Sequence, residues 1–141
     1  MDSTQKIAET LRNGGYKATT QRIAIAQTIL RSNDHPSAEE IHENVLRHHP
    51  TISLSTVYNT LHILRDMNFI NEIMIKGKTR YDSNPDMHVN LICEECGRIF
   101  DVQETTLFND IEKISKKLRF RIKGQRIDVY GICSSCLNIY K

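Results

Sequence analysis

The chain contains at residues 53–82 the stretch SLSTVYNTLHILRDMNFINEIMIKGKTRYD, which predicts a helix with one polar face followed directly by a hairpin. Ser53 or Ser55 can cap the helix, because a serine hydroxyl accepts a hydrogen bond from the first helical turn. Val57, Leu61 and Leu64 are spaced to lie on one buried face. The opposite face is rich in hydrogen-bonding groups and poor in charge, and it carries Ser55, Thr56, Tyr58, Asn59 and His62.

Three shorter helices are predicted before this stretch. The first ends at residues 13–15, Asn-Gly-Gly, and the second begins at Thr19 or Thr20. The third begins at Ser37, and Glu40 completes a capping box with it. Helical spacing predicts these buried residues: Ile7 and Leu11 in the first helix, Ile23, Ala26 and Leu30 in the second, and Ile41 and Val45 in the third.

The hairpin consists of a strand over residues 69–75, a turn at 76–78 and a returning strand at 79–82. Short helices followed by a basic hairpin is the order of a winged helix-turn-helix domain, in which the last helix enters the DNA major groove. Tyr58 and Asn59 are then candidates for base contacts. The basic residues expected near phosphates, or else solvated, are Lys17, Arg22, Lys76, Lys78 and Arg80. A helical bundle with a solvated polar face is the alternative, and the basic hairpin favours DNA binding.

The four cysteines form two C-x-x-C pairs, Cys93 with Cys96 and Cys133 with Cys136. Two such pairs supply the four thiolates of a closed, structural zinc site. Two disulfides or one redox-active pair are the alternatives. Disulfides seldom persist in the cytosol, where we expect the chain because it shows no signal peptide and no long apolar segment. A thioredoxin-like site would leave the second pair unexplained.

The second half of the chain predicts a small αβ module. Strands are expected over residues 89–93, 98–102, 120–123 and 127–132, and Leu107, Ile111, Ile114 and Leu118 predict an amphipathic helix. So small a sheet has open edges and little core, which favours pairing with a second copy. We therefore predict an α+β chain with a winged-helix domain at 1–82, a hinge at 83–87 and a dimerisation domain at 88–141.

Composition places few limits on this interpretation. The chain has 141 residues, of which 39% are hydrophobic and 26% charged, and its formal net charge is +2. A charge this small is weak evidence for DNA binding, so the motifs must carry that prediction. The sequence shows no membrane segment and no site for a small organic substrate.

Nitrogen and oxygen donors gather near the predicted hinge. His88 and Asp82 flank it, Asn90 lies two residues beyond His88 on the same side of a strand, Asp101 is in the next strand, and His35 is in an earlier loop. One ion bound by donors from both modules would fix the modules relative to each other. Each donor alone is more often an ordinary surface or turn residue.

These residues occur in stretches that resemble the ferric uptake regulator family of metal-dependent repressors over nearly the full chain. The stretches are TTQR (19–22), DHPSA (34–38), STVYNTL (55–61), RYD (80–82), HVNLICEECG (88–97) and VYGIC (129–133). The resemblance implies a homodimer that binds palindromic operator DNA, a structural Zn²⁺ held by four cysteines, and a regulatory Fe²⁺ or Mn²⁺ between the modules.

Asp101 and Asn59 are more similar to the peroxide-sensing branch than to the iron sensors, which usually have Glu and Arg there. That branch implies regulatory ligands at His35, Asp82, His88, position 90 and Asp101, with Fe²⁺-dependent oxidation of His35 or His88 by hydrogen peroxide. Position 90 is normally His and is Asn90 here. Its carbonyl oxygen either binds the ion, giving a harder ligand set, or leaves a four-ligand site.

Other functions fit less well. An iron- or zinc-responsive repressor of the same fold, switched by metal occupancy alone, is the nearest alternative. A zinc hydrolase needs an open zinc position and a thiol oxidoreductase needs a reactive thiol, and a four-thiolate zinc site leaves neither. We therefore predict a regulator rather than an enzyme, with a protein-binding adaptor as the remaining alternative.

Overall fold

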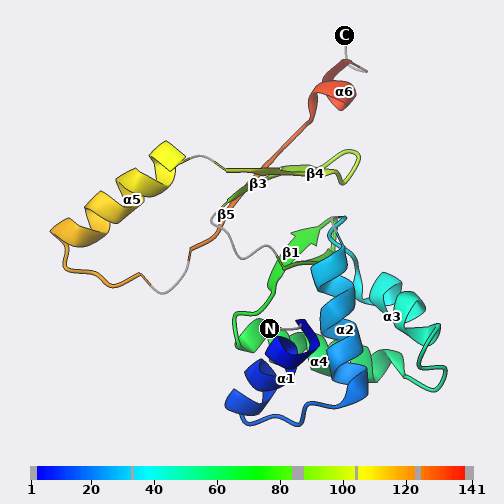
Figure 1. Cartoon of the computed structure of the whole chain (residues 1–141). Helices are drawn as coiled ribbons and strands as arrows, with labels where there is room; N and C mark the ends of the chain where they lie inside the picture. The colour runs from blue at the N-terminus through cyan, green and yellow to red at the C-terminus, as the bar shows by residue number, and fades with distance from the viewer. Residues whose placement is uncertain (1–2, 33, 84–87, 104, 123–124, 139–141) are drawn as a thin grey trace. The chain divides into compact units, whose positions relative to one another are not determined.

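The computed structural model describes residues 3–32, 34–83, 88–103, 105–122 and 125–138. The chain divides into two compact units, Met1–Pro85 and Asp86–Lys141 (Figure 1). Residues 84–87 of the predicted hinge lie outside the described residues.

The first unit contains helices α1 (Ser3–Asn13), α2 (Thr20–Arg31), α3 (Ala38–Leu46) and α4 (Leu54–Asp66). Thr19, Ser37 and Ser53 cap α2, α3 and α4, and each side-chain oxygen accepts a hydrogen bond from the backbone N–H three residues later. At the position of the predicted capping box, the Ser37 hydroxyl also donates to the Glu40 carboxylate at 3.2 Å, a contact between the two side chains. Local hydrogen bonds thus set where these helices begin.

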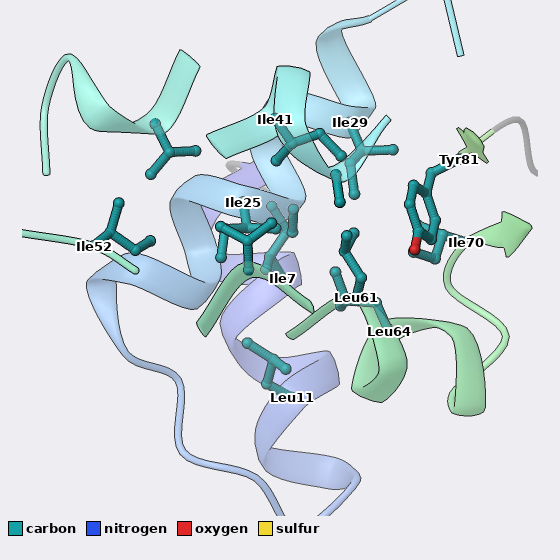
Figure 2. Close-up of a cluster of buried hydrophobic side chains, with 14 residues drawn as sticks. Ile7, Leu11, Ile25, Ile29, Ile41, Ile52, Leu61, Leu64, Ile70 and Tyr81 are labelled. Carbon is teal, nitrogen blue, oxygen red and sulfur yellow. The ribbon is translucent and has the colours of Figure 1, made fainter. Parts of the chain in front are cut away.

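The apolar faces of the four helices meet in one core (Figure 2). The stripes predicted in α1, α3 and α4 are buried, whereas the stripe predicted in α2 is only partly confirmed, because Ala26 is buried and Ile23 is half-buried but Leu30 is not buried. Leu30 is 41% exposed, and Ile25 and Ile29 are buried in its place. Helix α2 has apolar residues around more than one face, so spacing within the helix cannot choose among them. Packing against α1, α3 and α4 makes that choice.

Strands β1 (Asn71–Ile75) and β2 (Lys78–Asp82) form the antiparallel hairpin that follows α4. Lys76 and Gly77 at the turn have φ of 50° and 78°. Two consecutive residues with positive φ are the pattern of a type I′ turn, whose twist matches that of a hairpin. Arg65 of α4 forms an ion pair with Glu72 of β1, with 3.0 Å between Nη1 and Oε1.

The second unit contains a three-stranded sheet in the order β4-β3-β5, with β3 (Val89–Cys93), β4 (Ile99–Val102) and β5 (Ile127–Gly131). Strand β4 is antiparallel to β3 and β5 is parallel to it. Helix α5 (Thr105–Lys117) lies between β4 and β5 in the chain and, together with β4, forms the long connection between the parallel neighbours β3 and β5. A short helix, α6 (Ser134–Leu137), follows the second cysteine pair.

The strand predicted at residues 120–123 is not found among its described residues, 120–122. The backbone N–H of Phe120 instead bonds to the carbonyl of Ser115 at 2.9 Å, and Arg119 takes a left-handed φ of 53°. This pattern ends a helix by turning the chain back over its last carbonyls. The hydrogen-bonding group that a strand would need is therefore used to end α5.

Apolar side chains of the second unit remain uncovered. On the sheet, Leu91, Phe100, Val102 and Val129 are 38–47% exposed. On α5, the predicted stripe includes Ile114 at 58% and Leu118 at 73% exposure. Within the described part of the second unit this stripe is not covered by a core, and exposed apolar patches of this kind often mark interaction surfaces.

Candidate metal centres and nucleic-acid interface

The four cysteine sulfurs converge in the second unit. Cys93 Sγ lies 3.8 Å from Cys136 Sγ, and Cys96 Sγ lies 3.8 Å from Cys133 Sγ. All four sulfurs lie within 4.8 Å of one another. A tetrahedral zinc site with Zn–S bonds of about 2.3 Å has S···S edges of about 3.8 Å. The geometry therefore fits a structural Zn²⁺, and these distances are far longer than a disulfide bond of about 2.05 Å.

Backbone geometry holds the two pairs in place. Gly97 has a φ of 76° and its N–H bonds to the Cys93 carbonyl, which closes a tight turn after the first pair. Gly131 makes no such turn, because it is the last residue of β5 and pairs with Cys93. The parallel pairing of β3 and β5 therefore brings the second cysteine pair to the first.

The thiols differ in acidity. Hydrogen bonds from the backbone N–H groups of Cys96 and Cys133 lower the pKa of Cys93 to about 6. A hydrogen bond with Cys133 and burial raise the pKa of Cys136 to about 12. Four thiolates this close repel one another, so a divalent cation is needed for all four to be ionised together.

Within the first unit, the structure brings His35 and Asp82 together. His35 Nε2 lies 3.9 Å from Asp82 Oδ1, and the two side chains are 7% and 6% exposed. His35 comes from the loop before α3, and Asp82 is the last residue of β2. A buried imidazole beside a buried carboxylate offers nitrogen and oxygen donors of the kind that divalent metal ions bind.

Arg80 holds the loop that presents His35. Its Nε donates to the His35 carbonyl at 2.6 Å, and its Nη2 donates to the Asp34 carbonyl at 2.7 Å. His35 has a φ of 51°, a left-handed conformation that non-glycine residues rarely adopt unless held. We expected Arg80 near phosphate, whereas its guanidinium donates to two carbonyls of the loop that carries His35. Nothing in the local sequence indicates this contact, because 45 residues separate the two partners.

Within the second unit, Asn90 lies between two aspartates across the sheet. Asn90 on β3 pairs with Asp101 on β4 and with Asp128 on β5. Paired residues share a face of the sheet, so the three side chains form one polar row. Asn90 is 3% exposed, and His88, just before β3, is 8% exposed. Asp128 was not predicted as a site residue, because its partner became evident only from the strand register.

Most of the candidate DNA-facing residues lie on the outer side of α4. Ser55, Asn59 and His62 are exposed, and Thr56 and Tyr58 are half-buried. The Tyr58 hydroxyl donates to the Glu39 carboxylate of α3 at 2.9 Å, and this hydrogen bond raises the pKa of Tyr58. Tyr58 is therefore a protonated donor held in one orientation. Glu39 was missed in the sequence because it lies on another helix.

The basic candidates surround this face to different degrees. Lys17, Lys76 and Lys78 are exposed, with Lys76 at the hairpin turn. Arg22 is half-buried and donates from Nη1 to the Lys17 carbonyl at 2.9 Å. The exposed lysines can reach a phosphate backbone.

A helical domain with a basic hairpin, joined to a unit whose four cysteines fit zinc, defines a class of metal-binding transcriptional regulators. Residues 13–130 match the model of the ferric uptake regulator family. The chain belongs to this family, and like its members it is a metal-responsive regulator and not an enzyme.

Individual relatives agree with this assignment. The chain is 35% identical over 128 residues to the peroxide-responsive repressor PerR of Staphylococcus aureus strain USA300, covering 89% of this chain and 86% of the relative. The chain is also similar to the solved structure of PerR from Streptococcus pyogenes, with 32% sequence identity and a TM-score of 0.55. The match covers 96% of this chain and 94% of that one. The structure of the Helicobacter pylori ferric uptake regulator Fur, which has three functional metal-binding sites, matches with 25% sequence identity and a TM-score of 0.78. This match covers 96% of this chain and 91% of that one.

Among the described residues, no helix is both long and apolar enough to cross a membrane.

Proposed function

We propose that this chain is a cytoplasmic repressor that binds a palindromic operator as a homodimer when Fe²⁺ or Mn²⁺ occupies a regulatory site. We further propose that it senses hydrogen peroxide through oxidation of His35 or His88. The observation that carries the proposal is the buried pair of His35 and Asp82, 3.9 Å apart. The similarity to peroxide-responsive PerR supports the sensing function.

The proposed regulatory ligands are His35, Asp82, His88, Asn90 and Asp101. Two imidazoles, two carboxylates and an amide oxygen form an oxygen-rich set, which suits Mn²⁺ and Fe²⁺ better than a set of softer donors does. The two carboxylates balance the charge of a divalent ion. Because the set draws on residues of both units, an ion bound by all of it would stabilise one arrangement of the units, and we propose that this arrangement is the one that binds DNA.

When bound, Fe²⁺ would supply the redox chemistry that activates peroxide without being consumed overall, so the two electrons that reduce H₂O₂ come from the imidazole ring. In the proposed reaction, a ring carbon of His35 or His88 gains one oxygen atom of H₂O₂, and the other oxygen leaves as water. Both side chains are at least nine-tenths buried, so they are protected from oxidants that do not react at the site. An oxidised ring is a poorer ligand, and losing it removes the constraint that favours DNA binding.

Peptide mass spectrometry tests this proposal. After anaerobic loading with Fe²⁺ and addition of peroxide, we expect one added oxygen on the peptide containing His35 or His88, together with loss of operator binding. In protein loaded with Mn²⁺, neither peptide should gain mass, and operator binding should be unchanged. His62 is the internal control, because it is exposed on α4 and outside the proposed ligand set.

Equal oxidation with both metals, or none at either histidine, would contradict peroxide sensing. If the Fe²⁺ form kept its DNA in peroxide but released it in chelator, the chain would instead be an iron- or zinc-responsive regulator switched by occupancy alone.

The uncovered apolar surface supports the proposed homodimer. The sheet bears a cavity of about 300 Å³ whose lining includes Leu91, Phe100, Val129 and Ile132. We propose that a second copy covers this surface and the exposed stripe of α5. Pairing would present two α4 helices to successive turns of the major groove, which is how dimeric helix-turn-helix proteins recognise palindromes.

Two substitutions distinguish base contacts from phosphate contacts. Asn59→Ala should change sequence preference, with a loss of about 1–3 kcal/mol at the base pair that Asn59 contacts, because an amide pairs well with adenine. Lys76→Ala should weaken binding to all sequences and reduce the salt slope by about 1. Binding measured on an operator library at two salt concentrations would show both effects. Equal weakening of every sequence by both variants would contradict the role of Asn59.

A further inference from the structure

The amide of Asn90 is held in one orientation by the neighbouring strand. Asn90 Nδ2 donates to Asp128 Oδ1 at 3.0 Å. The second oxygen, Asp128 Oδ2, accepts from Arg126 Nε at 2.9 Å. A carboxylate accepts hydrogen bonds and donates none, so the side of the amide that faces Asp128 must be its NH₂ group. Arg126 and Asp128 together therefore fix which end of the Asn90 side chain faces β5.

The other end of the amide is left with its lone pairs available. Asn90 Oδ1 is buried and has no hydrogen-bond partner among the residues that the structure describes. Buried acceptors without a partner are rare in folded proteins and usually have a specific reason. Because Nδ2 faces Asp128 on β5, Oδ1 is the free end of the amide, and the other neighbour of Asn90 in the sheet is Asp101 on β4.

We propose that Asp128, held by Arg126, is a positioning residue that makes Asn90 an oxygen ligand of the regulatory ion. This inference rests on the regulatory site proposed above. An amide oxygen binds hard cations, whereas an amide NH₂ offers them no lone pair, so the opposite orientation would turn N–H groups toward the ion. An oxygen donor also favours Mn²⁺ and Fe²⁺ over Zn²⁺ relative to an imidazole at the same position.

The test is Mn²⁺ binding by the full-length, zinc-loaded protein, followed by electron paramagnetic resonance of unbound Mn²⁺. Asp128→Asn keeps the size of the side chain but can both donate and accept, so it no longer dictates the amide orientation. We expect Mn²⁺ affinity to fall about tenfold or more, as is typical when a residue that orients a metal ligand is lost. Zn²⁺ affinity at the same site should fall less in this variant. Asp110→Asn, the same charge change at an exposed position of α5, should leave both affinities unchanged.

A double-mutant cycle separates positioning from a general structural effect. In an Asn90→Ala background, Asp128→Asn should have no further effect on Mn²⁺ affinity, because there is no amide to orient. A tenfold loss that persists in that background would overturn the inference, as would wild-type affinity in Asp128→Asn alone. If the wild-type protein bound no Mn²⁺ beyond its structural zinc, the regulatory site itself would be wrong. That result is distinguishable from failure of the Asp128 role.

Discussion

Replacing Cys96 with serine should release the zinc and unfold the second unit while the first unit stays folded. The second unit has little core, since its buried apolar residues among the described residues are Val89, Ile92, Cys93 and Cys136. Structural zinc contributes about 10–16 kcal/mol of apparent binding free energy in small domains. That amount is comparable to the whole stability of an ordinary domain, about 5–15 kcal/mol. Without zinc, the second unit has too little apolar burial to remain folded.

Hydrogen exchange followed by mass spectrometry, together with zinc quantitation, would measure this effect. We expect β3, β4 and β5 to lose their protection and α2 and α4 to keep theirs, because the first unit has a core of its own. Cys96 is exposed, so its replacement removes a ligand and little packing. Ser135→Ala is the matched control, because Ser135 lies between Cys133 and Cys136 but provides no thiolate. A Cys96→Ser protein with one equivalent of zinc and unchanged protection would show that the cysteines are not the main support of this unit.

Features that depend on neighbouring residues were predictable from the sequence. The caps at Ser37 and Ser53, the buried faces of α1, α3 and α4, and the hairpin are each set within about one or two turns of chain. The cysteine site was also predictable, because two C-x-x-C pairs restrict the ligand geometry wherever the chain brings them together. These local features were sufficient to indicate both the class of fold and the zinc site.

Features that depend on distant pairing were not predictable. The buried side of α2 is chosen by the three helices around it, and residue 120 ends α5 instead of beginning a strand. The same limit applies to the candidate regulatory site. The orientation of Asn90 depends on Asp128, which lies 38 residues later in the chain. The two residues meet because β3 and β5 pair in parallel, with α5 between them in the sequence. The conformation of His35 depends on Arg80, 45 residues later. The sequence predicted the candidate donors, whereas the contacts that Asp128 and Arg80 make to Asn90 and His35 emerged only from the fold.

Replacing Asp82 with asparagine should abolish the metal-dependent gain in operator affinity. In the proposed mechanism the ion stabilises only the arrangement of the units that binds DNA, so its effect equals its differential affinity for that arrangement. Coupling free energies of this kind are typically about 1–3 kcal/mol, or about 5–150-fold in affinity. Asparagine has nearly the same size as aspartate but lacks the charge that binds the ion. His35→Ala should have the same effect, because it removes the neighbouring donor at 3.9 Å.

Operator affinity should be measured with Mn²⁺ and with chelator, on a palindrome selected by the Mn²⁺-loaded wild-type protein. The wild type should bind more tightly in Mn²⁺, whereas the Asp82→Asn and His35→Ala proteins should bind equally weakly in both conditions. Glu9→Gln removes one negative charge from an exposed position of α1 and should keep the full metal response. Because Asp82 pairs through its backbone with Asn71 at the end of the hairpin, an unchanged melting temperature would show that Asp82→Asn has not simply unfolded the first unit. Variants that kept the full difference between Mn²⁺ and chelator would place the regulatory ion elsewhere, since no ion can favour one arrangement through a donor that it does not need.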